Sequence, residues 1–368
     1  MIFRPFGNTG KQVSAISFGA MRFRPEDYKK DLQICADILL RAHELGVNYF
    51  DTAPLYCESL SEKIVGLARK QIRGEKPYIS TKCNFRTTFT AQEAYDEIQK
   101  SRDLLEVDTI DFYHMWSIRV FEQYQDMTKP GGVYDGFLRA QEEGLIGHIC
   151  ASVHANGEDI RKIAQDGKVD VITLGYNATN FAYRQEGLHA CYENNLGVVI
   201  MNPLSGGLIP RNPDYFSFLK QGEDESIIHA ALGFLLGQKE ISTALVGPAS
   251  IEELEECVKV AQVHHEMSAE VFEGLKKQIN TKMDALCTSC AYCDECPVGI
   301  PIVPFLSLYN ESLLGEKMST CVLRMRLLYD LAPEHAAKCI RCGICENLCT
   351  QKLPIMDRLE EISKQEPR

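Results

Sequence analysis

The chain has 368 residues, 45% hydrophobic and 24% charged, a composition typical of a globular protein with one large domain and one small one. Its net charge of −12 argues against nucleic-acid binding, because a phosphate backbone requires a basic face. The sequence has no apolar run of about 18 residues, as a membrane span would require, and its N-terminus does not resemble a signal peptide, so we expect a cytoplasmic protein.

Short apolar runs alternate with longer amphipathic stretches over most of the chain. Strands are expected at 14–18, 47–50, 78–81, 110–115, 148–153, 171–175, 197–201 and 243–246. Helices are expected at 31–45, 60–70, 91–105, 134–143, 158–166, 185–194, 226–238 and 251–260. Eight β–α units in series predict an α/β fold, a (β/α)8 TIM barrel. The alternative, an open doubly wound sheet, would require a Gly-x-Gly-x-x-Gly turn that residues 18–22 do not supply.

Polar and aromatic residues follow the predicted strands, where a barrel builds its active site. They are Asp51, Tyr56, Lys82, His114, Trp116 and His154. Tyr56 beside a Lys82–Asp51 pair is a workable general acid, because the lysine charge would lower the tyrosine pKa towards neutrality. The alternative is an ordinary ion pair at the barrel end with Tyr56 in a packing role. His154 is expected either to contact substrate or to cap its loop.

Two cysteine runs mark the C-terminal part of the chain. The eight cysteines are Cys287, Cys290, Cys293 and Cys296 in the first run, and Cys339, Cys342, Cys345 and Cys349 in the second. This spacing predicts two [4Fe–4S] clusters, in which the fourth cysteine of each run ligates the other cluster. A zinc site is the alternative, although zinc does not require three closely spaced cysteines twice over.

The segment around the cysteine runs is expected to form a separate, small and mostly helical ferredoxin-like domain. A linking helix is expected at 267–284, and helical periodicity returns at 305–331. We therefore predict a barrel over 1–282 and an iron–sulfur domain over 283–368, with metal ligation supplying much of the folding energy of the smaller domain.

Several of these segments together resemble the aldo–keto reductase family. Asp51-Thr52-Ala53 with Tyr56 is similar to its second-strand signature, and Thr81-Lys82 to its third-strand lysine. The C-terminal cysteines resemble the branch of the family with a ferredoxin-like extension. The resemblance implies a nicotinamide cofactor, NADP(H) or NAD(H). It also implies a set of cofactor-binding residues: Ser152, Asn177, Pro203, Leu204, Ser205, Gly206, Gly207, Gly247 and Ser250. Gly206 and Gly207 also suit close backbone approach to a pyrophosphate.

The chain departs from the family pattern at several site positions. Trp116 stands where the resemblance implies a catalytic histidine, and His114 lies two residues earlier on the same strand, one layer deeper. Ala249 stands where many members place an arginine for the 2′-phosphate of NADP. We expect Trp116 to make the site drier and to favour bulky or planar substrates.

The sequence supports an oxidoreductase acting on a carbonyl or related unsaturated small molecule, or oxidising the alcohol. His114 and His154 are candidate substrate contacts, and the clusters would be either an electron relay or a structural staple. A ferredoxin-like or flavin electron carrier is a candidate partner. The alternatives are an isomerase or lyase on the same barrel, and an electron-transfer adaptor with a vestigial site.

Overall fold

The computed structural model forms two compact units. It describes residues 1–84, 87–179, 181–223, 225–263, 270, 272–275, 286–287, 292–293, 295–329 and 331–365. The first unit contains Met1–Leu204 and Leu219–Val271, and the second contains Ser205–Phe218 and Phe272–Arg368. The division falls eleven residues before the predicted boundary at 282, and it assigns one internal segment of the chain to the second unit.

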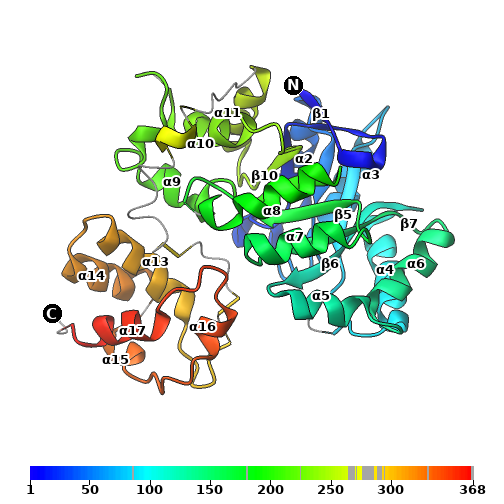
Figure 1. Ribbon diagram of the computed structural model, residues 1–368. Helices are drawn as coiled ribbons and strands as arrows, with labels where there is room; N and C mark the ends of the chain where they lie inside the picture. The colour runs from blue at the N-terminus through cyan, green and yellow to red at the C-terminus, as the bar shows by residue number, and fades with distance from the viewer. Residues whose placement is uncertain are drawn as a thin grey trace. The chain divides into compact units, whose positions relative to one another are not determined.

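The first unit is built around a closed parallel barrel of eight strands (Figure 1). In chain order the strands are β3 (Ile16–Gly19), β4 (Tyr49–Asp51), β5 (Tyr78–Lys82), β6 (Ile110–Ile118), β7 (Ile146–Val153), β8 (Val171–Gly175), β9 (Gly197–Met201) and β10 (Thr243–Val246). β10 pairs with both β3 and β9, which closes the ring. The predicted eight-stranded α/β barrel is confirmed, and the open sheet is excluded because no strand of the ring is left at an edge.

Helices follow the strands in sequence. They are α1 (Pro25–Tyr28), α2 (Leu32–Glu44), α3 (Ser61–Gln71), α4 (Ala91–Leu105), α5 (Phe121–Thr128), α6 (Val133–Glu142), α7 (Gly157–Gln165), α8 (Phe181–Glu193), α10 (Ile227–Leu236) and α11 (Ile251–Lys259). Side-chain caps define several of their starts. Thr90 and Glu93 form a reciprocal capping box at α4, and Asn156 caps α7. α5 was not predicted from the sequence.

An N-terminal hairpin supplies an aromatic plug for the barrel core. β1 (Phe3–Pro5) and β2 (Gln12–Ser14) pair antiparallel, and Phe6 follows directly after β1. Phe6 is fully buried and makes edge contacts with the rings of Tyr49 and Phe112, which come from two different barrel strands. This end of the barrel is therefore filled by side chains, which leaves the carboxyl ends of the strands for chemistry.

The second unit is mostly helical. Its elements are η2 (Ser205–Gly207), α9 (Leu208–Arg211), η3 (Ser217–Leu219, whose last residue belongs to the first unit), α13 (Ile302–Leu313), α14 (Met318–Tyr329), α15 (Pro333–Ala336), α16 (Ile344–Leu348) and α17 (Ile355–Ser363). The helical stretch expected at 305–331 is two helices, separated by a turn in which Gly315 adopts φ +100°. The helix expected at 267–284 lies largely outside the described residues.

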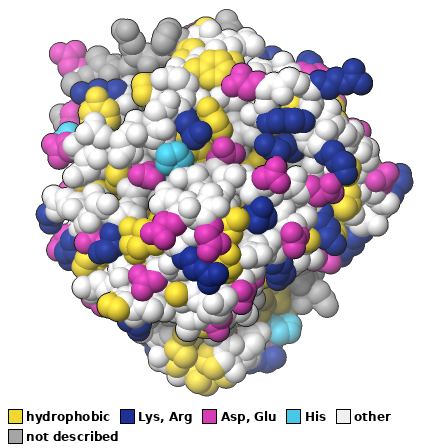
Figure 2. Space-filling model, turned by 90° about the vertical axis from the view of Figure 1, so that its right-hand side faces the viewer, with side chains coloured by type: hydrophobic (Ala, Val, Ile, Leu, Met, Phe, Trp, Pro, Cys, Tyr) yellow, Lys and Arg dark blue, Asp and Glu magenta, His cyan; other side chains and the backbone are white. Residues whose placement is uncertain are grey.

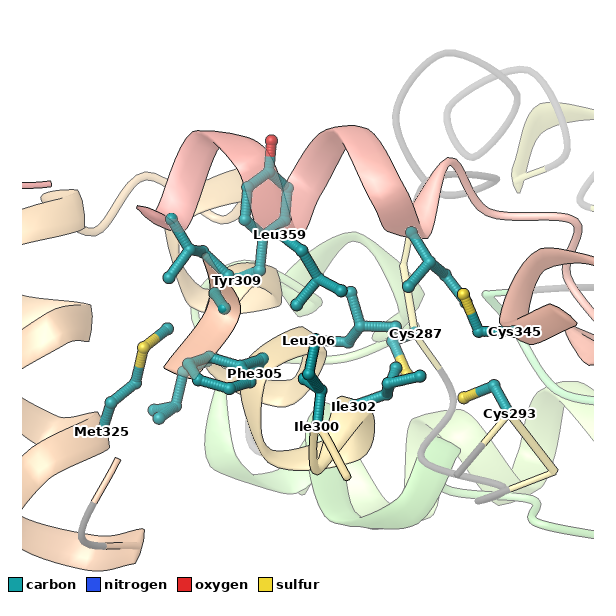
Figure 3. Close-up of a cluster of buried hydrophobic side chains, with 14 of the residues drawn as sticks. Cys287, Cys293, Ile300, Ile302, Phe305, Leu306, Tyr309, Met325, Cys345 and Leu359 are labelled. Atoms are coloured by element: carbon teal, nitrogen blue, oxygen red, sulfur yellow. The ribbon is translucent and has the colours of Figure 1, made fainter. Parts of the chain in front are cut away.

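The core of the second unit combines aliphatic side chains with cysteines. Figure 3 shows Cys287, Cys293 and Cys345 among the side chains of this core, with Ile302 and Leu306 of α13 and Leu359 of α17. Ile302 and Leu306 have no exposed surface. Cysteines of both runs therefore contribute to this hydrophobic core.

The surface carries charges of both signs. On the face shown in Figure 2, basic and acidic side chains are interspersed among hydrophobic side chains, uncharged polar side chains and backbone. Within the described part of the chain, no helix combines the length and apolar character needed to cross a membrane.

Candidate functional site

A buried ion pair lies at the carboxyl ends of β4 and β5. The Nζ atom of Lys82 is 2.8 and 2.7 Å from the two carboxylate oxygens of Asp51, and it donates a third hydrogen bond to the carbonyl of Thr52 at 2.7 Å. Ser80 donates a further hydrogen bond to Asp51. Asp51 and Lys82 are 3% and 1% exposed, so removing either partner would leave an uncompensated buried charge.

Tyr56 follows β4 and lies beside this pair. The Lys82 ammonium is 5.2 Å from the centre of the Tyr56 ring. Three successive residues with positive φ, Cys57, Glu58 and Ser59, then turn the chain into α3. This tight left-handed turn holds Tyr56 close to the strand end from which it comes.

The pKa of Tyr56 differs from the sequence prediction. Burial, and after it the negative charge of Asp51, raise this pKa well above its ordinary value, while Arg22 acts in the opposite direction. The predicted lowering by Lys82 was wrong because Asp51 neutralises that ammonium at hydrogen-bond distance. Tyr56 is therefore a phenol that keeps its proton over the neutral pH range.

His114 lies beneath this site. Its Nε2 is 2.9 Å from the hydroxyl of Thr173, and its Nδ1 is 3.2 Å from the carbonyl of Thr81. The side chain has no exposed surface, and burial together with the charge of Lys82 lowers its pKa well below the ordinary value. The deeper layer expected for His114 agrees with this position, but a neutral, enclosed imidazole does not reach a substrate unless its neighbours move.

Trp116 occupies the next outward position on β6. Its indole meets the Tyr56 ring edge to face, with the ring centres 5.7 Å apart. The side chain is only 6% exposed, so it forms a wall of the tyrosine environment and excludes water from it. The pairing of β6 with β7 becomes irregular between Met115 and Ile118, so this wall lies where the strand departs from regular geometry.

His154 follows β7 and is held by an arginine that the sequence analysis missed. Arg184 of α8 donates hydrogen bonds to the carbonyls of His154, Ala155 and Gly175. Burial and the charges of Arg184 and Arg119 lower the pKa of His154 well below its ordinary value. No spacing pattern distinguishes Arg184, because its partners are backbone carbonyls at the ends of two separate strands.

The predicted cofactor residues of the barrel lie at four strand ends. Ser152 of β7 is fully buried, and its hydroxyl has no hydrogen-bond partner among the described residues. Asn177 follows β8 and donates to the carbonyl of Asn202. A Cβ on Gly247 would lie 3.3 Å from the carbonyl oxygen of Gly19, so glycine allows β10 and β3 to approach closely here.

The remaining predicted cofactor residues follow β9 and β10. Pro203 and Leu204 follow β9 and are the last residues of the first segment of the first unit. Ser205, Gly206 and Gly207, which come next, belong to the second unit. All three of the latter have positive φ, at 52°, 66° and 87°. Ser250 caps α11 by accepting a hydrogen bond from the Glu253 backbone.

In the second unit, cysteines from both runs line one pocket. They are Cys296 of the first run and Cys339, Cys342 and Cys345 of the second. The other lining residues are apolar apart from Gly343: Pro297, Val298, Ile302, Ile340, Met356 and Leu359. Three closely spaced thiols and the last thiol of the other run therefore surround the same space.

The remaining cysteines group elsewhere in the unit. Cys287 is fixed by Asn310, which accepts from its backbone N–H at 2.8 Å and donates to its carbonyl at 2.7 Å. Cys287 and Cys349 belong to the same buried core cluster, and Arg358 interacts electrostatically with both. Cys290 lies outside the described residues.

The described residues do not form a metal-binding group. Within the described ranges, no three His, Cys, Asp or Glu side chains are placed to hold a metal ion. The four thiols of the pocket line a space that they share with apolar side chains.

Comparison with known proteins places the barrel in a family. The Aldo/keto reductase family model matches residues 15–280. L-galactose dehydrogenase of Arabidopsis thaliana is 28% identical over 69% of this chain and 86% of its own length. NADH-specific methylglyoxal reductase of Escherichia coli is 30% identical, but the match spans only 49% of this chain and 59% of that protein. An aldo-keto reductase of Bacillus halodurans superposes with a TM-score of 0.63 at 22% identity, covering 75% of this chain and 96% of its own.

The family model spans well over half of the chain, and the relatives are named as a dehydrogenase and a reductase. The chain is therefore an oxidoreductase that belongs to the aldo/keto reductase family.

Proposed function

We propose that the barrel reduces a carbonyl or related unsaturated small molecule, or oxidises the corresponding alcohol, with Tyr56 as the proton donor. The observation that carries this proposal is the buried Asp51–Lys82 pair beside Tyr56 at adjacent strand ends. A phenol that stays protonated near neutral pH donates its proton only when a stronger base, such as a substrate oxygen gaining negative charge, forms beside it.

Lys82 and Asp51 position this donor. Lys82 is fixed by three hydrogen bonds, so its charge does not move during the reaction and remains oriented towards the space above the tyrosine ring. Asp51 in turn holds the Lys82 side chain in place through two of these hydrogen bonds. We assign both residues to the orientation and stabilisation of Tyr56, and not to direct proton transfer.

The residues at the barrel mouth fit a nicotinamide cofactor. The buried Ser152 hydroxyl without a described partner is a polar group that a carboxamide would satisfy, and Asn177 lies at the next strand end. When bound, the nicotinamide supplies a hydride.

The start of α11 favours NADH over NADPH. The backbone N–H of Ala249 already donates to the carboxylate of Glu253 at 2.8 Å, and Glu252 lies in the same helical turn. At the position where the family resemblance places the 2′-phosphate, a phosphate would therefore meet two carboxylates and one exposed guanidinium, that of Arg24, which lies 3.9 Å from Glu253.

Trp116 sets the class of substrate. Its indole cannot titrate, and it narrows the space next to Tyr56, so a planar or bulky substrate that stacks on the indole fits better than a small aldehyde. A Trp116→His variant should gain activity on simple aldehydes and acquire an ionisation near neutral pH. Wild-type activity on such aldehydes that the Trp116→His substitution does not improve would contradict this assignment.

We further propose that the two cysteine runs hold two [4Fe–4S] clusters with exchanged fourth ligands. The pocket lined by Cys296, Cys339, Cys342 and Cys345 supports this, because it combines three ligands of one run with the last ligand of the other. Such clusters supply one-electron transfer. Cys342 is exposed, so this site is accessible to a ferredoxin-like or flavin electron carrier.

An isomerase or lyase with structural clusters, and an electron-transfer adaptor, make different predictions. One sample of anaerobically purified full-length protein separates them by its iron and sulfide content and by a nicotinamide titration. We expect about eight irons per chain and saturable nicotinamide binding, with NADH bound more tightly than NADPH. Stoichiometric zinc would contradict the cluster assignment. An absence of nicotinamide binding would contradict the reductase.

A further inference from the structure

Two buried polar residues at the start of α3 lie between Tyr56 and the strand that carries Lys82. Ser61 and Glu62 are 0% and 2% exposed, and they come shortly after the left-handed turn that follows Tyr56. Serine and glutamate mostly lie at protein surfaces, so their burial requires hydrogen-bond partners inside the protein. Those partners are residues at the ends of the neighbouring strands.

The first connection runs through Ser61 and Thr52. The backbone N–H of Ser61 donates a hydrogen bond to the carbonyl of Tyr56 at 3.3 Å. The Ser61 hydroxyl donates to the carbonyl of Ala20 at 2.6 Å and lies 2.6 Å from the hydroxyl of Thr52. A hydroxyl has a single proton, so Thr52 is the donor between the two hydroxyls. Because the carbonyl of Thr52 accepts from Lys82 at 2.7 Å, this series of bonds joins Tyr56 to Lys82.

The second connection runs through Glu62 and Thr81. The Thr81 hydroxyl donates to Oε1 of Glu62 at 2.8 Å, and both side chains are buried. Successive side chains of a strand point to opposite faces, so Thr81 faces α3 while Lys82, the next residue, points into the barrel. This bond fixes the end of β5 against the helix that follows Tyr56.

The position of Tyr56 depends on such connections, because this residue lies in a turn outside the strands and helices. The hydrogen bonds of the barrel sheet therefore do not fix it. We infer that the two connections form a brace whose residues position the Tyr56 phenol beside Lys82. This inference rests on the proposal that Tyr56 is the proton donor. Misplacing a reacting group by about 1 Å costs up to about 100-fold in rate, so the brace contributes to turnover although its four side chains are at most 2% exposed.

The test compares Thr52→Val, which removes the hydroxyl at nearly constant volume, with Thr52→Ser, which keeps it. Thr243→Val is the matched control, because Thr243 and Ser17 form a similar pair of buried hydroxyls, 2.5 Å apart, and Thr243 is the first residue of β10, at the end of the barrel away from the site. The full-length proteins are assayed with NADH and phenanthrenequinone, a planar carbonyl probe. Thr52→Val should lower kcat by at least ~10-fold with little change in KM. Thr52→Ser should recover most of the turnover, and Thr243→Val should keep it.

A second measurement does not depend on activity. Trp116 is the only tryptophan, and its ring centre lies 5.7 Å from that of Tyr56. Loss of the brace would open this contact, so acrylamide should quench the Trp116 fluorescence more strongly in Thr52→Val than in the wild type. Thr52→Ser and Thr243→Val should show the quenching of the wild type.

Wild-type turnover or wild-type quenching in Thr52→Val would overturn the inference and leave the assignment of Tyr56 intact. Equal changes in Thr243→Val would also overturn it, because they would show a general effect of losing a buried hydroxyl. If Thr52→Val does not fold, Ser61→Ala decides by the same two measurements, since it removes the same bond and keeps the backbone N–H that Tyr56 accepts. Near-normal turnover of Tyr56→Phe would instead refute the proton-donor proposal itself.

Discussion

The two units of this protein assemble their functional groups in different ways. In the barrel, Asp51, Tyr56, Lys82 and Trp116 come from three strands, and hydrogen bonds between protein groups fix the charged pair. In the second unit, cysteines from two short runs line a pocket as free thiols. Protein contacts therefore hold the charged pair of the barrel, whereas under the cluster proposal the cysteines would be held together by what they bind.

Removing iron should distinguish the two units most strongly. Cluster ligation in a unit this small contributes on the order of 10 kcal/mol, so a Cys345→Ala variant should lose protection over 295–329 and 331–365 in hydrogen-exchange mass spectrometry. Trp116 is the only tryptophan and belongs to the barrel, so the wavelength of its fluorescence maximum should not change. Cys321→Ala is the matched control, because Cys321 is buried in the same core but belongs to neither run. Equal loss of protection in both variants would contradict the prediction.

Removing the proton donor should slow the reaction strongly without altering the structure. Tyr56→Phe should reduce turnover at least ~100-fold with little change in cofactor affinity, since general acid catalysis accounts for that order of rate. Tyr78→Phe serves as the control, because Tyr78 begins β5 at the end of the strand away from Lys82. Near-normal turnover of Tyr56→Phe would move the proton donor to another group.

Cofactor choice should depend on a smaller electrostatic effect. We expect NADH to be preferred over NADPH by about tenfold, because a 2′-phosphate near α11 would meet the carboxylates of Glu252 and Glu253. Glu253→Gln should lower the dissociation constant of NADPH, because one negative charge near the 2′-phosphate is removed, and it should leave the dissociation constant of NADH unchanged. Dissociation constants for both cofactors test this, and a preference for NADPH in the wild type would show that the phosphate binds elsewhere.

The buried histidines should make barrel stability sensitive to acid. The pKa of His114 and of His154 is lowered in the folded state, while unfolded histidine titrates near 6.5. Below about pH 6.5 the unfolded chain binds protons that the folded chain does not. The free energy of unfolding should therefore decrease as the pH is lowered, by up to about 1.4 kcal/mol per pH unit for each of the two histidines. Urea midpoints from Trp116 fluorescence should decrease from pH ~7.5 to ~5.5. This decrease should be smaller in His114→Gln but not in His189→Gln, a change at an exposed histidine.

The sequence pattern predicted regular elements best where short-range chemistry defines their ends. Helix α4 and strands β8, β9 and β10 have the predicted bounds, and α4 begins at a complete capping box. Helix α5 was missed because its eight residues are too few to establish a clear helical period. Residues 205–218 belong to the second unit although they lie between two segments of the first unit in the sequence. This assignment depends on long-range contacts, which no local sequence pattern encodes.

The site residues show the same contrast between features that local sequence patterns predict and features that depend on long-range contacts. The positions of Asp51, Tyr56 and Lys82 could be inferred because parallel strands bring their ends to one rim. The raised pKa of Tyr56 could not, since it depends on how completely the site is buried and on how closely Asp51 binds Lys82. Arg184 could not be found from spacing either, because its hydrogen-bond partners are backbone carbonyls distant from it in sequence.

The exchange of cysteines between the runs has a consequence for synthesis. Cys296 lies in a pocket with Cys339, Cys342 and Cys345, and Cys349 shares a buried core cluster with Cys287. A nascent chain that has emerged only as far as residue 330 carries no complete set of four ligands for either crossed centre, although the whole barrel has been translated. With crossed ligation, the first centre could be loaded with iron only after residue 349 has left the ribosome and the second only after residue 345, so a product truncated before residue 339 would be unable to mature either centre.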